Sequence, residues 1–170
     1  MVKNSTLRHT ISLYVANKPG VLNRIAQVFS RRGYNIDSLV VSESTDPQYS
    51  YMNIVALGDL PTLQQILKQL NKLIDVVSAR DYSNEDVIQK ELGLFKIHCP
   101  QEKRTEVLQI AQTFKAVTED LTATTLTLMV TGKTEKLDAL KEMLLPYGIL
   151  ELVRSGKVLI SRGESHTSRN

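Results

Sequence analysis

A turn that decides the fold of the first half of the chain reads Asn17-Lys18-Pro19-Gly20-Val21-Leu22. Residues 9–16 lead into it and alternate between polar and apolar side chains, which predicts a half-buried strand. Apolar residues then recur at helical spacing over 21–29, which predicts a helix that packs one face on a core. Gly33 is a natural C-cap for this helix, and the next strand is expected to begin at Asn35.

The rest of the first half completes a familiar order of elements. Strands are expected over 35–45, 49–57 and 74–82, and a helix over 59–70. Asp59 or Thr62 can cap this second helix at its N-terminus. The order strand, helix, strand, strand, helix, strand is that of the ferredoxin-like sandwich.

The same order recurs after a polar break at 83–86. Strands are expected over 91–99, 116–121, 124–131 and 149–153, with a short one over 158–160, and helices over 102–115 and from residue 134 to Pro146. The predicted fold class is therefore α+β, a tandem of ferredoxin-like βαββαβ domains over 1–82 and 83–170. A single mixed domain is the alternative.

The small size of each predicted domain favours an oligomer. A unit of roughly 70 residues is near the lower limit for an independent domain, so an open sheet face or edge strand is expected to need a partner. The polar tail, residues 163–170, is expected to be frayed.

Composition excludes several classes of protein. The chain has 170 residues with a net charge of +3, and its Lys and Arg residues are scattered, which favours a solvated surface over a nucleic-acid patch. Cys99 is the single cysteine, so no internal disulfide can form and a reducing compartment is expected. The first residues do not form a secretory signal, and no apolar run reaches the roughly 20 residues of a membrane span. We therefore expect a soluble cytoplasmic protein.

No set of residues predicts catalysis or metal binding. His98 and Cys99 are adjacent on a predicted strand, so their side chains point to opposite faces and cannot serve each other. Neither a Cys/His metal motif nor a phosphate-binding glycine loop is present. RNA-binding ferredoxin-like modules stack bases on sheet aromatics, but aromatics make up only 5% of this chain. Tyr49 and Tyr51 are the weak exception, and packing is the favoured role for them.

The turn at 17–22 is the remaining candidate for a binding site. The first backbone N–H groups of a helix lack partners and carry partial positive charge, so they can bind a small anion such as a carboxylate. A purely structural interpretation is also open, in which Asn17 caps the helix, Pro19 fixes φ and Gly20 eases the bend.

Two groups of motifs carry a family resemblance. Residues 17–22, followed by 32–39, resemble an ACT domain. Residues 131–139 and 148–156 are similar to the second domain and closing motif of the small regulatory subunits of acetolactate synthase (acetohydroxyacid synthase). The resemblance extends from about residue 8 to residue 163.

The resemblance implies a function. In this family the first domain forms a homodimer with its copy, and a branched-chain amino acid, typically valine, binds at the seam. The subunit attaches to a separate catalytic large subunit, raises its activity and confers feedback inhibition of branched-chain amino acid biosynthesis. Thiamine diphosphate, FAD and magnesium belong to that catalytic subunit, so no cofactor and no catalytic residue is expected in this chain, and neither nucleic acid nor membrane is an expected partner.

The resemblance also assigns the effector site. The matching positions are Asn17, Gly20, Val21 and Leu22 in the turn of one chain and Asn35 and Ile36 in the other chain. The N–H groups of Gly20, Val21 and Leu22 would bind the carboxylate, and an Asn amide oxygen the ammonium group. Val21, Leu22 and Ile36 are expected to form an apolar wall. The alternatives are an ACT module that regulates another target and an RNA-binding tandem.

Overall fold

The computed structural model describes residues 7–165 and 167–168 and divides the chain into two units. The first unit combines the chain up to Ile88 with the segment from Lys157, and the second spans Gln89–Gly156. This division differs from the expected domains 1–82 and 83–170, because the last segment joins the first unit. The difference has a tertiary origin: residues near the C-terminus contact the first sheet.

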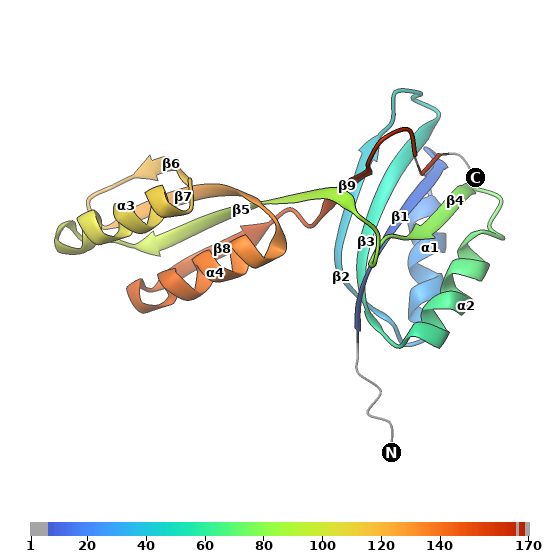
Figure 1. Ribbon diagram of the computed structural model, residues 1–170, viewed down its shortest axis with the longest axis horizontal. Coiled ribbons are helices and arrows are strands. Elements are labelled where there is room, and N and C mark those ends of the chain that lie inside the picture. Colours follow the sequence, from blue (N-terminus) through green and yellow to red (C-terminus); the bar gives the residue numbers. More distant parts are fainter. Residues whose placement is uncertain (1–6, 166, 169–170) are drawn as a thin grey trace, which may run out of the picture. The chain divides into compact units, whose positions relative to one another are not determined.

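The first unit has the predicted βαββαβ order (Figure 1). Its elements are β1 (Leu7–Ala16), α1 (Val21–Ser30), β2 (Asn35–Glu43), β3 (Tyr49–Gly58), α2 (Leu60–Leu70) and β4 (Val76–Asp81). The antiparallel sheet has the order β2-β3-β1-β4, with Ala16 opposite Tyr49 and Asn35 opposite Leu57. The fourth strand is shorter than the predicted 74–82, and Ile74 is fully exposed.

Helices α1 and α2 cover one face of this sheet and enclose its core (Figure 1). Alternate residues of β1 and β3 point into the core, as the period of two requires. They meet the apolar stripes of the two helices, and the fully buried side chains include Ile11, Leu13, Ile25, Phe29, Ile54, Leu63 and Ile66. At the C-terminus of α1, Gly33 has φ 67° and the N–H of Tyr34 reaches the carbonyl of Phe29 at 3.1 Å. Gly33 therefore ends the helix as predicted.

The other face of the first sheet carries buried polar side chains that bind the C-terminal segment. Thr167 is 5% exposed, and its hydroxyl lies 3.0 Å from the hydroxyl of Tyr82 and 3.4 Å from that of Ser12. The hydroxyl of Ser78 donates to the carbonyl of Thr167. The expectation of a frayed tail over 163–170 is therefore wrong at Thr167, because this sheet supplies hydrogen-bond partners that a sequence pattern does not reveal.

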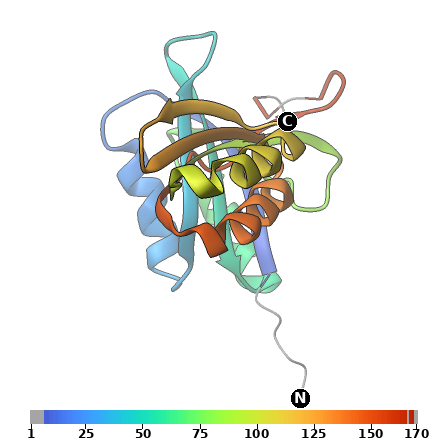
Figure 2. The ribbon, with the colours of Figure 1, turned by 90° about the vertical axis from the view of Figure 1, so that its left-hand side faces the viewer.

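The second unit repeats the order of elements around its own core. Its elements are β5 (Val87–His98), η1 (Gln101–Lys103), α3 (Arg104–Thr113), β6 (Val117–Leu121), β7 (Thr125–Gly132), α4 (Thr134–Leu144), η2 (Leu145–Tyr147) and β8 (Ile149–Arg154). The strand order is β6-β7-β5-β8, and α3 and α4 lie side by side on one face (Figure 2). The short strand β9 (Val158–Ser161), predicted over 158–160, follows in the segment from Lys157 that belongs to the first unit. The single helix expected over 102–115 is instead a 3-10 turn followed by α3.

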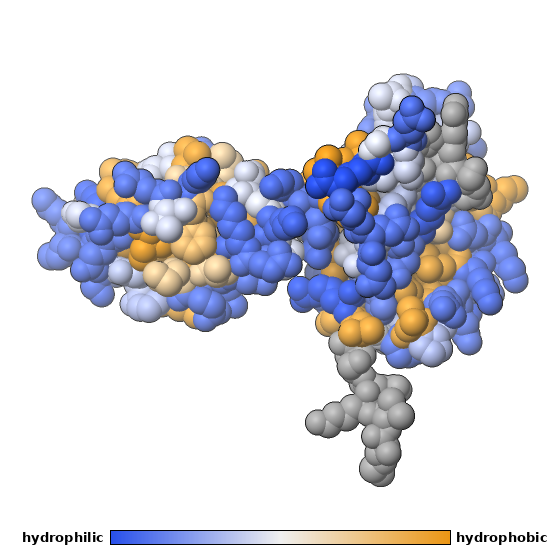
Figure 3. Space-filling model, viewed as in Figure 1, coloured by the Kyte–Doolittle hydropathy of each residue, from blue (hydrophilic) through white to orange (hydrophobic). Residues whose placement is uncertain are grey.

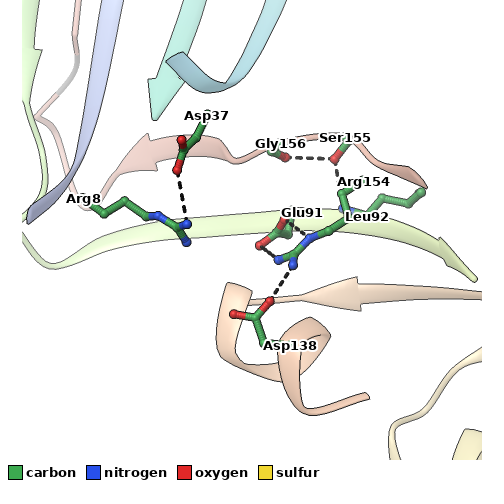
Figure 4. A network of polar contacts seen from close by, with 8 residues as sticks. All are labelled: Arg8, Asp37, Glu91, Leu92, Asp138, Arg154, Ser155 and Gly156. Atoms are coloured by element: carbon green, nitrogen blue, oxygen red, sulfur yellow. Dashed lines mark hydrogen bonds and ion pairs between the residues drawn. The ribbon is translucent and has the colours of Figure 1, made fainter. Parts of the chain in front are cut away.

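A buried ion pair joins the first and last strands of the second unit (Figure 4). Arg154 of β8 donates two hydrogen bonds to Glu91 of β5, at 3.0 Å and 2.7 Å, and Glu91 is only 5% exposed. Arg154 also contacts Asp138 of α4 at 2.5 Å. The hydrogen bonds to Glu91 are the main cause of a raised pKa of Arg154. A paired guanidinium in this position is the arrangement that allows a carboxylate to be buried.

Candidate functional site

Residues 18–21 form a type II turn that connects β1 to α1. Gly20 has φ 85° and ψ −11°, and the N–H of Val21 points to the carbonyl of Lys18 at 3.4 Å. Such a turn takes Pro in its second position and needs a residue with positive φ in its third, which explains Pro19 and Gly20. A Cβ on Gly20 would also lie 3.3 Å from Nη1 of Arg24, so both backbone and space favour glycine.

After this turn, the N-terminus of α1 has no side-chain cap. Its N-cap is Gly20, no side chain caps it, and its first turn carries no acidic residue. Within the described part of the chain, no acceptor bonds the N–H groups of Gly20, Leu22 and Asn23. The predicted donors were Gly20, Val21 and Leu22, so Asn23 replaces Val21, whose N–H closes the turn. Unpaired N–H groups at the positive end of a helix are able to donate hydrogen bonds to an anion.

The other α-helices differ from α1 at this end. The carboxylate of Asp59 accepts the N–H of Thr62 at 2.9 Å and caps α2, as predicted, and this hydrogen bond lowers the pKa of Asp59. Helices α3 and α4 each carry an acidic residue in the first turn, Glu106 and Glu135. The N-terminus of α1 therefore has no acidic residue at its N-cap or in its first turn, whereas α2, α3 and α4 each have one that interacts favourably with the helix dipole.

Asn17 does not cap α1, so that part of the purely structural interpretation is wrong. Its Nδ2 donates to the carbonyl of Pro47 at 3.0 Å and lies 3.4 Å from Oε2 of Glu43, while its backbone N–H donates to Gln48 at 2.7 Å. The hairpin between β2 and β3 thus determines the orientation of this side chain. Its amide oxygen accepts no hydrogen bond from any residue the structure describes, which keeps it available as an acceptor.

The apolar wall expected from Val21, Leu22 and Ile36 is only partly present. Val21 is 3% exposed and its side chain belongs to the core, whereas Leu22 is 45% exposed beside the turn. Ile36 is half-buried and packs against the core of its own unit. Leu22 is therefore the apolar side chain that the turn presents to solvent, whereas the side chain of Val21 packs in the core.

Asn35 and Ile36 lie at the other end of the sheet from the turn. Asn35 pairs with Leu57 and the turn follows Ala16, which pairs with Tyr49, so the two points are separated by the length of β3. At about 3.3 Å per residue this is about 26 Å, and one chain cannot bring them to one small ligand. Asn35 is exposed, and its Nδ2 lies 3.5 Å from Asp37, which also pairs with Arg8 at 3.2 Å (Figure 4).

Strand β2 is an edge of the first sheet. It pairs with β3 on one side, and among the described strands none pairs with its other side. An unpaired edge offers a row of backbone donors and acceptors to another strand. The register shifts between Ile36 and Ser38, so a bulge at Asp37 directly follows the two predicted site residues.

Arg24 and Asp75 form an ion pair beside the turn that sequence reasoning missed. Nη2 of Arg24 lies 2.6 Å from Oδ2 of Asp75, and the carbonyl of Asp75 accepts the N–H of Ala16 at 2.7 Å. The two residues are far apart in the sequence, and no local pattern marks them as partners. Nη1 of the Arg24 guanidinium group lies beside Gly20.

Hollows on the described surface include one on each unit. One, of about 340 Å³, lies between the turn and the β2–β3 hairpin and is lined by Ala16, Asn17, Lys18, Pro47, Gln48 and Tyr49. The other, of about 360 Å³, lies on the second unit, where Ile110, Phe114 and Met143 line a groove and apolar surface is visible over α3 and α4 (Figure 3). In that groove the hydroxyl of Tyr147 donates to the carboxylate of Glu106 at 3.2 Å.

The remaining candidates take the roles that the sequence predicts for them. His98 is exposed and Cys99 is fully buried, on opposite faces of the chain. Tyr14 stacks on Tyr49 and packs on Tyr51, with ring centroids 5.0 Å and 4.9 Å apart. Among the residues described, no group of His, Cys, Asp and Glu side chains could hold a metal ion, and no helix is long and apolar enough to cross a membrane.

The first unit is a ferredoxin-like fold whose first helix follows a Pro-Gly turn, and its sequence places the chain in the class of proteins that contain an ACT domain. Residues 11–78 match the family described as the acetohydroxyacid synthase (AHAS) small subunit-like ACT domain, and residues 90–163 match the family described as the small subunit of acetolactate synthase. The chain belongs to the family of acetolactate synthase small subunits. The resemblance noted in the sequence is confirmed.

Several relatives match along almost their entire length. The probable acetolactate synthase small subunit of Methanothermobacter thermautotrophicus is 44% identical over 164 residues, covering 96% of this chain and 98% of that protein. The acetolactate synthase small subunit of Mycolicibacterium smegmatis is 41% identical, with 95% of each chain covered. The crystal structure of the small subunit from Thermotoga maritima superposes with a TM-score of 0.82 at 32% identity, covering 94% of this chain and 99% of that one. The predicted fold class is thereby confirmed.

Proposed function

We propose that this chain is the regulatory subunit of an acetolactate synthase and that two copies of it bind a branched-chain amino acid, valine, between their first units. The observation that carries the proposal is the division of the site. The uncovered N-terminus of α1 and the exposed Asn35 lie at opposite ends of one sheet, so a ligand that contacts both needs two chains. The family to which the chain belongs supports the choice of ligand class and of catalytic partner.

The turn is suited to the carboxylate of an amino acid. The N–H groups of Gly20, Leu22 and Asn23 are unpaired within the described chain and lie at the positive end of a helix dipole. Asn17 offers an amide oxygen for the ammonium group, and the exposed Leu22 offers apolar surface for a branched side chain. Asn35 and Ile36 of a second chain would complete the site from the other side.

The open edge of β2 supports a dimer in which two sheets meet edge to edge. Each chain would then contribute its turn to one site and its β2 start to the other, so the dimer would hold two sites. A monomer would bind valine poorly, because it holds only half of each site. The catalytic large subunit would carry thiamine diphosphate, FAD and magnesium in the cytoplasm, and this chain would raise its activity.

Feedback inhibition would follow from a difference in affinity. A ligand can bias a partner only if it binds one arrangement of the dimer more tightly than another, and couplings of about 1–3 kcal/mol are usual. Valine bridging two chains would favour one arrangement of the seam. The catalytic subunit would respond to that arrangement rather than to valine itself.

The substitution Gly20→Asp tests the proposal. The new carboxylate would occupy the place of the ligand's carboxylate at the helix N-terminus, so valine should bind about a hundredfold more weakly. Inhibition of the reconstituted holoenzyme by valine should be lost while activation remains. Gly33→Asp is the matched control, because Gly33 also has positive φ but ends the same helix, with open space around the site of a Cβ. Full inhibition in the Gly20→Asp holoenzyme would overturn the turn as the site.

A further inference from the structure

We propose that Arg24 is the residue that selects a carboxylate at this site, and that Asp75 holds its guanidinium group beside Gly20 for this purpose. The inference rests on the proposed function, because it concerns the same ligand. It adds a charged side chain to a site whose other polar groups are backbone N–H groups and amides.

The position of Arg24 follows from helix geometry. Arg24 belongs to the first turn of α1, and side chains on a helix lean toward its N-terminus. Its Nη1 lies 3.3 Å from the place that a Cβ on Gly20 would occupy. The guanidinium group therefore borders the same turn as the unpaired N–H groups, and a side chain at position 20 would push it away.

Asp75 fixes the guanidinium group in this position. Nη2 of Arg24 and Oδ2 of Asp75 are 2.6 Å apart, and the Asp75 side chain is only 15% exposed. The carbonyl of Asp75 accepts the N–H of Ala16, the last residue of β1. Asp75 therefore contacts both elements that flank the turn, α1 through its side chain and β1 through its carbonyl. These two contacts fix the position of the guanidinium group relative to the turn.

The guanidinium group retains donors for a second anion. Arginine has five N–H donors in a planar fork, and a single carboxylate oxygen occupies one end of that fork. The Arg24 side chain is 49% exposed, and its guanidinium group forms an ion pair with Asp75 through Nη2. Nη1, on the side of Gly20, can therefore donate to a carboxylate that the N–H groups of Leu22 and Asn23 also bind. Such charge-assisted hydrogen bonds are stronger than those of an uncharged amide.

The predicted consequence is selectivity for the charged end of the ligand. Valine carries a carboxylate, whereas valinamide has the same side chain and ammonium group but an uncharged amide in its place. A site with Arg24 should prefer valine strongly, and a site without the guanidinium charge should lose most of that preference. A residue that only stabilises the turn would change the affinity for both ligands by the same factor.

The experiment is calorimetric titration of the full chain with valine and with valinamide. In Arg24→Gln, the affinity for valine should fall about tenfold, as expected for one charge-assisted hydrogen bond, with the affinity for valinamide nearly unchanged. Arg24→Lys keeps a charge without the fork and should lose less. Arg31→Gln, at the other end of α1, is the control and should leave both affinities unchanged. Circular dichroism confirms that each variant is folded.

The outcomes separate this inference from the proposed function. An unchanged ratio of valine to valinamide affinity in both Arg24 variants, with binding abolished by Gly20→Asp, would overturn the role of Arg24 and leave the site in place. An equal loss of affinity for both ligands in Arg24→Gln would show that Arg24 only stabilises the turn, and it would also overturn the inference. A wild-type chain that binds neither ligand would overturn the proposed function itself.

Discussion

The two units share an order of elements but differ at the turn between the first strand and the first helix. In the first unit a Pro-Gly type II turn leaves the N-terminus of α1 uncovered, with a guanidinium group beside it. In the second unit Pro100 leads into a 3-10 turn that carries Glu102, and α3 follows with Glu106 in its first turn. The two units therefore share an order of elements, while their turn residues leave only the N-terminus of α1 without a cap or an acidic residue in its first turn.

The sheets differ in how their polar groups are satisfied. The first sheet binds Thr167 from the end of the chain on its helix-free side. In the second sheet, Arg154 of β8 forms an ion pair with the buried Glu91 of β5. Buried polar groups of the first sheet thus find partners in a distant segment of the chain, whereas the buried carboxylate of the second sheet finds its partner on a neighbouring strand. Substitutions in each unit should therefore have separable effects on stability and on ligand binding.

The largest expected effect on stability is that of Arg154→Ala. The variant leaves the carboxylate of Glu91 buried without its partner, which should lower the free energy of unfolding by about 3 kcal/mol. Urea denaturation measures this loss. Asp138→Ala removes the exposed partner of the same guanidinium and should cost less than about 1 kcal/mol. Valine affinity should remain unchanged in both, and a loss of affinity would contradict the assignment of sensing to the first unit.

Asn35→Ala should weaken valine binding without affecting the fold. The side chain is exposed, and its loss removes one hydrogen bond to the ligand, which corresponds to about a tenfold lower affinity in calorimetry. Activation of the catalytic subunit should be intact. Asn84→Ala replaces another exposed asparagine and serves as the control. Equal affinity for valine in Asn35→Ala and wild type would count against a contact from the second chain.

Thr167→Ala tests whether the C-terminal segment stabilises the first unit. The buried hydroxyls of Tyr82 and Ser12 lose a partner, so the free energy of unfolding should fall by about 1–2 kcal/mol. Amide hydrogen exchange should become faster in β1 and β4 and stay the same in β5 and β7. Thr118→Ala, on an exposed strand of the second unit, should have no such effect. Unchanged exchange in β1 and β4 would show that this segment contributes nothing to the first sheet.

The smallest effect is expected in the acid sensitivity of α2. The hydrogen bond from Thr62 lowers the pKa of Asp59 below its ordinary value of 3.8 in the folded state. The cap therefore contributes stability above that value and loses it as the pH falls through the lowered pKa. Asp59→Asn should keep a cap and depend less on pH between 5 and about 2, as judged by urea midpoints. The same pH dependence in Asp59→Asn and wild type would exclude Asp59 as the source.

Local signals account for what the sequence could predict. The alternation of polar and apolar residues and the helical spacing of apolar residues predict the strands and α-helices to within a few residues of their observed ends. Asp59 caps the N-terminus of α2 and Gly33 follows the C-terminus of α1, as predicted. The turn itself was recognised from Pro19 and Gly20, because these residue types specify backbone angles without tertiary help.

Contacts between distant segments account for what the sequence could not predict. Asn17 binds the hairpin at Pro47 instead of the helix, Arg24 binds Asp75, and Thr167 binds the first sheet. Each partner lies at least 30 residues away, and no spacing rule connects them. The N–H of Val21 points to the carbonyl of Lys18, because the exact type of turn decides which N–H is already used.

A dimer made of two different variants tests the central claim, that each site is shared by two chains. Gly20→Asp damages the turn, and Asn35→Ala damages the contribution from the second chain. In a purified heterodimer of these two variants, one site combines both damaged parts and the other combines both intact parts. Calorimetry should then find one site per dimer with the affinity of the wild type, although each variant alone binds weakly. No recovery of wild-type affinity in the heterodimer would contradict a site shared between chains.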